Sequence, residues 1–135
     1  MTYRASILRS IADIDASSWN ALAGTAQPFL RHEFLLALEA SGCTVPRNGW
    51  APEHLILKDI QNRVIGAIPL FRKEHSRGEF VVDFAWAGAY AQHGLHYYPK
   101  LIAAVPFTPV SGSRLLVSSA TDPTAARSAL VKAVC

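Results

Sequence analysis

Hydrophobic positions recur with two different periods along this chain of 135 residues, and these periods divide it into helices and strands. Apolar residues spaced three or four apart, next to capping residues, predict helices over residues 15–24, 31–41 and 122–135. Short apolar runs bounded by turn residues predict strands at 3–11, 54–58, 64–71 and 114–117. The polar loop 59–63 joins two of these strands as a hairpin.

The densest stretch is residues 79–98, EFVVDFAWAGAYAQHGLHYY. In an extended chain, Phe84 and Trp86 would share a bulky apolar face, whereas Glu79 and Asp83 would lie among small residues on the opposite face. This alternation predicts a strand over 79–87, the third of an antiparallel run that begins with the strands at 54–58 and 64–71. Pro99 then opens a short predicted helix that ends before Pro106. The predicted order is β-α-α-β-β-β-α-β-α, a mixed α+β fold with a mostly antiparallel sheet flanked by helices.

Composition indicates one folded domain, since half of the residues are hydrophobic and 17% are charged. The net charge of +3 comes without a lysine or arginine run, so no specific nucleic-acid site is predicted. Residues 85–121 hold only Lys100 and Arg114 as charged residues, which suits an anionic ligand. Two cysteines, no signal peptide and no membrane-spanning stretch predict a cytoplasmic protein.

Asp83 is the candidate catalytic residue, because a carboxylate on a largely apolar strand would have a raised pKa. A raised pKa suits a general base that takes a proton from an attacking amine. The alternative is that Asp83 is solvated, or forms an ion pair with Arg72 or Lys73 on a neighbouring strand.

A group of aromatic and polar residues follows Asp83 and could line a ligand pocket for a sugar or a peptide. The alternative is that the tyrosines pack on the core and that the lysine is an ordinary surface cation. His93 and His96 are three residues apart, but no third ligand has a recognisable spacing, so no metal site is predicted. The candidate substrate-binding residues are Trp86, Tyr90, His93, Tyr97, Tyr98 and Lys100.

The predicted order resembles the first half of the GNAT (N-acetyltransferase) fold. Four blocks are more specific and together resemble the N-terminal part of bacterial FemAB-like proteins, described as acting in peptidoglycan biosynthesis or recognition. These blocks are PFLRHEFLLALEASGC (28–43), GWAPEHL (49–55), GAIPLFRKEHSRGEFVVDFAWAGAY (66–90) and YYPKLIAAVPFTPVSGSRLL (97–116).

The resemblance implies a tandem pair of GNAT-like domains, of which residues 1–135 would be most of the first. The periodic pattern of the last helix still runs at Cys135, which favours the same interpretation. Related Fem enzymes transfer an amino acid from aminoacyl-tRNA to a peptidoglycan precursor. The donor of a longer protein would be acyl-CoA or aminoacyl-tRNA, and no cofactor is expected in these residues: the nearest match to an acyl-CoA-binding glycine turn, residues 108–113, has one glycine and a proline.

Two functions follow as expectations. The first is the N-terminal part of a Fem-like acyl or aminoacyl transferase acting on a peptidoglycan precursor, inactive without its second GNAT-like domain. The second is a non-catalytic GNAT-like module that binds a cell-wall or peptide ligand. Either would leave an unpaired sheet edge and an apolar patch exposed, so these residues alone are expected to self-associate.

Overall fold

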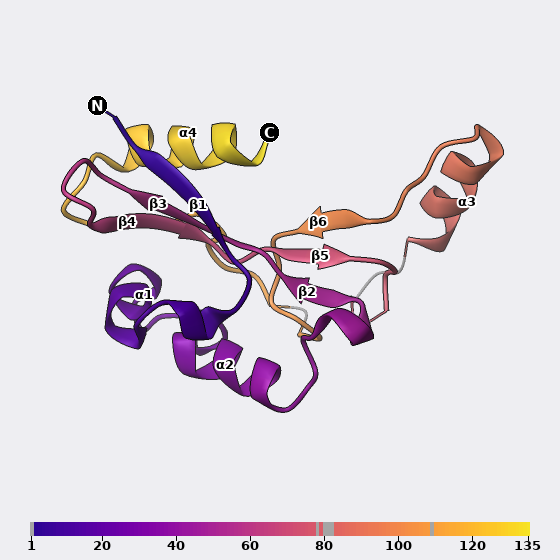
Figure 1. Ribbon diagram of the computed structural model, residues 1–135, viewed down its shortest axis with the longest axis horizontal. Helices are drawn as coiled ribbons and strands as arrows, with labels where there is room; N and C mark the ends of the chain where they lie inside the picture. Colours follow the sequence, from indigo (N-terminus) through magenta and orange to yellow (C-terminus); the bar gives the residue numbers. More distant parts are fainter. Residues whose placement is uncertain (1, 78, 80–82, 109) are drawn as a thin grey trace.

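The fold is α+β, with two antiparallel sheets and helices on both faces of the larger one (Figure 1). The computed structural model describes residues 2–77, 79, 83–108 and 110–135. The larger sheet has the order β1-β3-β4-β7 and the smaller the order β2-β5-β6. The strands are β1 (Arg4–Leu8), β2 (Trp50–Pro52), β3 (His54–Lys58), β4 (Val64–Ile68), β5 (Phe71–Lys73), β6 (Lys100–Ile102) and β7 (Leu116–Val117).

The four α-helices are α1 (Ala16–Ala23), α2 (His32–Ala40), α3 (Phe84–Gln92) and α4 (Pro123–Val134). Figure 1 shows α1 and α2 on one side of the larger sheet and α4 on the other. Sheet strands covered on both faces bury every side chain, and Leu55, Ile56 and Leu57 of β3 are all buried. The predicted helix starts at Asp15 and Asp122 are confirmed as N-caps, and Gly24 as a C-cap.

Two apolar clusters hold the larger sheet between its helices. Trp19 of α1 lies in the first, together with Ile56 of β3, and its indole N–H donates a hydrogen bond of 2.8 Å to the carbonyl of Leu30. Leu130 of α4 lies in the second cluster with Leu55 and Leu57. The β3–β4 hairpin confirms the predicted pairing, with Leu55 opposite Ile68.

The predictions for residues 79–105 are wrong in two places. Residues 84–92 form helix α3 instead of a continuing strand, while the part of that prediction on residues 80–82 lies outside the described residues. Seven of these nine helix residues are Ala, Gly, Gln or Trp, and their period-two alternation carries little information when no sheet covers the segment. The predicted helix after Pro99 is instead strand β6, which pairs with β5.

The smaller sheet was also missed: β2 lies in none of the predicted strands, and Phe71 is the one residue of β5 that a predicted strand includes. Three-residue strands carry too short a pattern to be distinguished from loops. Helix α3 has no buried residue and projects away from the body of the molecule (Figure 1). It exposes the apolar side chains of Phe84 and Trp86. The expected self-association stays a prediction.

Candidate functional site

Six of the seven sequence-predicted site residues lie on an arm formed by residues 83–98, which leaves the smaller sheet, contains α3 and returns to β6; the seventh, Lys100, lies on β6. The structure brings Asp83, Tyr90, Tyr97, Tyr98 and Lys100 together. It leaves two predicted residues apart from them: Trp86 is 65% exposed on α3, and His93 is exposed at the end of that helix.

The three tyrosine rings form successive edge-to-face contacts. Tyr90 of α3 and Tyr97 have ring centroids 5.1 Å apart at an interplanar angle of 80°. Tyr97 and Tyr98 follow at 5.0 Å and 89°. This right-angled geometry is the favoured arrangement of aromatic quadrupoles. It pins the tip of α3 to the extended segment before β6.

Charged groups hold the base of the arm. The Tyr97 hydroxyl donates a hydrogen bond of 2.8 Å to Asp83 Oδ2, and Lys100 Nζ donates to the same carboxylate oxygen. Lys100 Nζ also donates to Glu79 Oε1 at 2.8 Å. We call Glu79, Asp83, Lys100 and the three tyrosines the tyrosine cluster. Its polar groups mainly satisfy one another, except that two buried atoms, the Tyr98 hydroxyl and Glu79 Oε2, have no hydrogen-bond partner among the described residues.

The pKa of Asp83 is shifted in the direction opposite to the prediction. The hydrogen bonds from Lys100 and Tyr97 lower the pKa of this carboxyl below its usual value and outweigh its partial burial. The same hydrogen bond raises the pKa of the Tyr97 hydroxyl. Asp83 is therefore a paired carboxylate at neutral pH. Its partner is Lys100 on β6, whereas Arg72 and Lys73 bond elsewhere, because the missed β6 strand brings Lys100 beside it.

Lys73 on β5 connects this cluster to a neighbouring cavity. Its side chain is fully buried, with Nζ 3.8 Å from the centroid of the Trp50 ring and 3.9 Å from a Glu79 carboxylate oxygen. Nζ donates a 2.6 Å hydrogen bond to the Arg77 carbonyl. Burial lowers the pKa of Lys73 to about 8 against the opposing attraction of Glu79, so the amine remains mostly charged at neutral pH.

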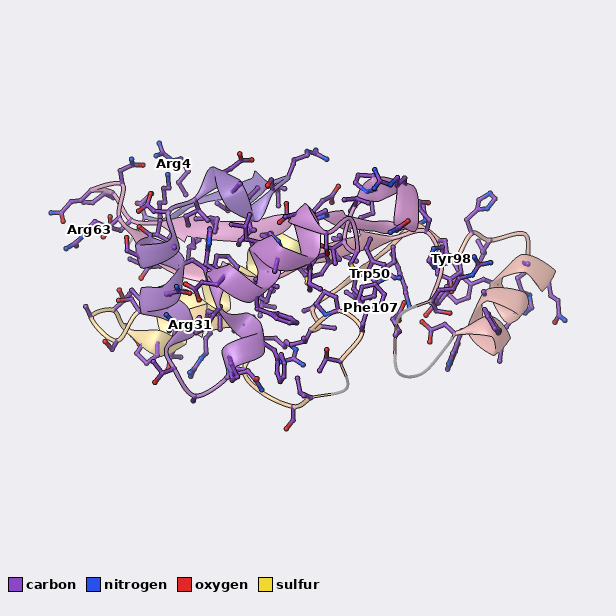
Figure 2. All side chains as sticks on the ribbon, turned by 90° about the horizontal axis from the view of Figure 1, so that it is seen from below. Arg4, Arg31, Trp50, Arg63, Tyr98 and Phe107 are labelled. Atoms are coloured by element: carbon purple, nitrogen blue, oxygen red, sulfur yellow. The ribbon has the colours of Figure 1, made fainter. Side chains whose placement is uncertain are left out.

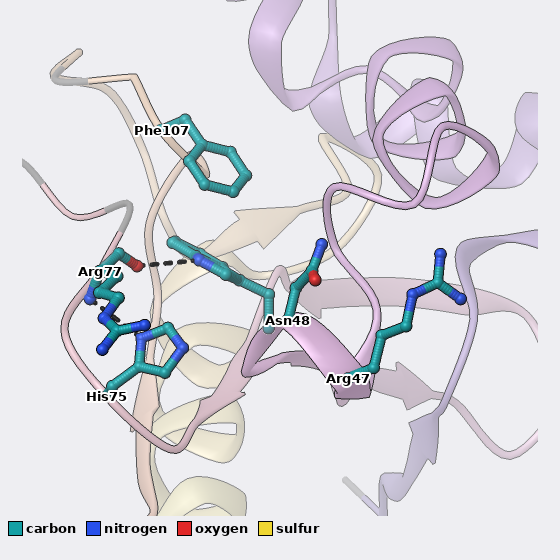
Figure 3. Close-up of a pocket in the computed structure, with 6 residues that line it drawn as sticks. Arg47, Asn48, His75, Arg77 and Phe107 are labelled. Atoms are coloured by element: carbon teal, nitrogen blue, oxygen red, sulfur yellow. Dashed lines mark hydrogen bonds between the residues drawn. The ribbon is translucent and has the colours of Figure 1, made fainter.

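The cavity, of about 310 Å³, opens beside Trp50 between the β5–α3 connection and the loop after β6 (Figure 3). Figure 3 shows the Arg47 side chain directed away from His75 and Arg77. The Nδ2 group of Asn48 donates to the carbonyl of Gly42. The cavity is lined by Arg47, Asn48, Trp50, His75, Arg77 and Phe107, and none of these is acidic.

Sequence reasoning missed the cavity, because its residues come from three segments joined only by the smaller sheet. The segment RKEHSR over residues 72–77, with three basic residues and a histidine, was the available signal, but no candidate site was predicted from it. Among the described residues, no three His, Cys, Asp or Glu side chains form a group that could hold a metal ion. None of the helices in the described ranges has the length and apolar character needed to cross a bilayer.

A family model for FemAB-like proteins, described as peptidoglycan biosynthesis/recognition, matches residues 10–135. The match includes the arm, the tyrosine cluster and the cavity. No curated protein and no solved structure matches the chain.

Proposed function

The chain belongs to the FemAB-like family of peptidoglycan biosynthesis and recognition, and on this premise we propose that it serves a Fem-like transfer of an acyl or aminoacyl group to a peptidoglycan precursor. Its own part in that reaction is recognition of the precursor by the tyrosine cluster. The donor would be acyl-CoA or an aminoacyl-tRNA.

The tyrosine cluster carries the proposal. Aromatic rings offer apolar faces for the C–H groups of a sugar, while their hydroxyls and neighbouring charges bond its polar groups. Tyr90 is 39% exposed, so its ring is accessible. The partnerless hydroxyl of Tyr98 is a buried group that a ligand could satisfy.

Asp83 favours recognition over proton transfer in this proposal. Its carboxylate already accepts hydrogen bonds from Lys100 and Tyr97, and its pKa is lowered. A general base is most effective when its pKa lies near the working pH. This observation also supports the second candidate, a GNAT-like module that binds a cell-wall or peptide ligand without catalysing its modification.

Calorimetric titration of the protein with a soluble muramyl peptide tests recognition. We expect saturable binding that Tyr90→Ala weakens by about fivefold, since loss of an aromatic contact costs about 1 kcal/mol. Trp86→Ala is the matched control, because Trp86 lies on the same helix, is exposed, and makes no ring contact with the tyrosines among the described residues. An equal effect of both variants, or no binding to the unsubstituted protein, would contradict the proposal.

Asp83→Asn separates recognition from catalysis wherever transfer activity can be assayed. Recognition predicts a raised KM for the precursor with an unchanged kcat and an unchanged pH profile. A lowered kcat together with a shifted pH profile would assign Asp83 to proton transfer instead.

A further inference from the structure

We propose that the cavity beside Trp50 binds a small organic oxyanion, a carboxylate or phosphate carried on an apolar or aromatic body. This site is distinct from the tyrosine cluster, so the two can fail separately. Its volume of about 310 Å³ is at the lower end of the range for ligand pockets.

Arg77 supplies the fixed positive charge. Three hydrogen bonds hold its backbone: the carbonyl accepts from Lys73 Nζ at 2.6 Å and from Trp50 Nε1 at 3.0 Å, and the N–H donates to His75 Nδ1 at 3.1 Å. Within the described part of the chain, no hydrogen bond or ion pair engages its guanidinium group. An arginine with a fixed backbone and free N–H donors suits a carboxylate or phosphate.

His75 supplies a second donor beside this charge. Because the Arg77 N–H donates to its Nδ1, that nitrogen is the acceptor and the proton of the neutral ring lies on Nε2. Figure 3 shows the His75 ring next to the Arg77 side chain. A ligand oxygen in the cavity could therefore accept from both side chains.

Gly49 allows this position of His75. A Cβ atom at residue 49 would lie 2.3 Å from His75 Nε2, and the φ angle of Gly49 is +75°. Both the close approach and the left-handed backbone therefore favour glycine. Gly49 also directly precedes Trp50, so it positions two of the residues that line the cavity, His75 and Trp50.

Phe107 supplies the apolar surface and is held in a strained conformation. Its φ angle is +60°, an outlier for a bulky side chain, and such strain persists where the surrounding structure imposes it, often at ligand sites. The ring packs on Trp50, with centroids 5.0 Å apart, yet remains 48% exposed. A flat or apolar ligand body could cover this exposed face.

The surrounding charge favours an anion. No acidic residue lines the cavity, and the buried ammonium group of Lys73 lies over the Trp50 ring. The Glu79 carboxylate beside Lys73 is paired with Lys73 and Lys100. A positive potential in a partly desolvated site strengthens its attraction for an anion.

Two-dimensional ¹H–¹⁵N NMR titration of the full chain with phenyl phosphate, benzoate, inorganic phosphate and benzyl alcohol tests the proposal. We expect saturable shifts of the Trp50 indole N–H and of the Gly49 and Arg77 amides with phenyl phosphate or benzoate, whichever headgroup the site prefers. Inorganic phosphate should bind more weakly and benzyl alcohol should cause no saturable shift. Shifts centred on Lys100, or equal responses to the anions and to benzyl alcohol, would overturn the proposal.

Two variants test which residue binds the anionic headgroup of the ligand and which binds its apolar body. Arg77→Gln should weaken the preferred aromatic anion by at least about tenfold, the usual scale of a charge-assisted hydrogen bond. Phe107→Ala should reduce its advantage over inorganic phosphate. Arg63→Gln is the control, because Figure 2 shows Arg63 at the far end of the molecule from Trp50 and Phe107. An Arg63→Gln effect equal to that of Arg77→Gln would mean nonspecific attraction only and would refute the site.

Discussion

The body of the molecule, formed by the larger sheet with α1, α2 and α4, and the arm at residues 83–98 are built in opposite ways. In the body, apolar side chains from helices on both faces cover the strands. In the arm, α3 buries no residue, and it is attached through ring contacts and the hydrogen bonds of Asp83. Burial stabilises the first region, whereas directional polar contacts position the second.

This difference in construction implies that the body determines the stability of the fold, whereas the arm determines ligand recognition. A short helix without buried surface is marginal in water, so the position of α3 depends on the contacts at its ends. Substitutions in the body should therefore change global stability, while substitutions in the arm should change its local order and the affinity for a ligand.

Trp19→Ala should have the largest effect on the body. The Trp19 side chain is fully buried, and its N–H bonds the Leu30 carbonyl. Truncation leaves a cavity and an unpaired carbonyl, with an expected cost of about 4 kcal/mol. Urea denaturation measures it. On the arm, the matched Trp86→Ala should change the unfolding free energy by less than about 0.5 kcal/mol. Similar costs for the two variants would remove the proposed distinction.

His54 should make the body sensitive to acid. The imidazole is fully buried between the rings of Trp19 and Phe71, and burial lowers its pKa from 6.5 to about 4. Between these values the unfolded chain binds more protons than the folded one, so the unfolding free energy falls as pH decreases from 6.5 to 4. The expected loss is about 3 kcal/mol, and above pH 7 this residue adds no pH dependence.

Denaturation at a series of pH values checks this prediction. His54→Asn removes the titrating group but keeps an acceptor for the Leu70 N–H, which now bonds His54 Nδ1. The slope between pH 6.5 and 4 should decrease in this variant. His93→Asn, at an exposed position on the arm, should leave the slope unchanged; a reduced slope there would count against His54 as the source.

The sequence predicted the body better than the arm, because burial shapes the sequence pattern of the body and not that of the arm. Where a face is buried, hydrophobic periodicity records it, so α1, α4 and the β3–β4 hairpin followed from the pattern. In residues 84–92 every residue is uncharged and none is buried. A sequence without a covered face has no informative period, and the strand prediction failed there.

The candidate site could be predicted only in part. Tyr97, Tyr98 and Lys100 are close in sequence to one another, so their grouping was accessible. The pairing of Asp83 with Lys100 depends on β6, whose three residues are too few to identify as a strand. The cavity joins Trp50, His75 and Phe107 across long sequence separations, which periodicity does not encode.

Gly49→Ala, in the region between body and arm, should cost an intermediate amount of unfolding free energy. The left-handed backbone and the close His75 ring make a side chain unfavourable at this position, at an expected cost of about 2 kcal/mol. Thermal or urea denaturation measures this cost, and the variant should also lose the NMR response to the aromatic anion. Gly88→Ala on α3 is the control, since a Cβ atom there meets nothing within 4 Å. It should be neutral or slightly stabilising, because alanine favours helices. If Gly88→Ala destabilised the protein and Gly49→Ala did not, the fold would require glycine at position 88 and not at position 49.

Asp83→Asn should have the smallest global effect and the most local one. The Asp83 side chain makes no capping hydrogen bond to α3, so the substitution isolates the charge that bonds Lys100. The ion pair is partly exposed, and its loss should cost less than about 1 kcal/mol in denaturation. Native-state hydrogen exchange should nevertheless show faster exchange of the α3 amides, with β3 unchanged.

Asp59→Asn, which removes the Arg63 ion pair of the β3–β4 turn, should leave α3 unaffected. Unchanged α3 exchange in Asp83→Asn would mean that the tyrosine contacts alone hold the arm, and the charged base would then have no positioning role.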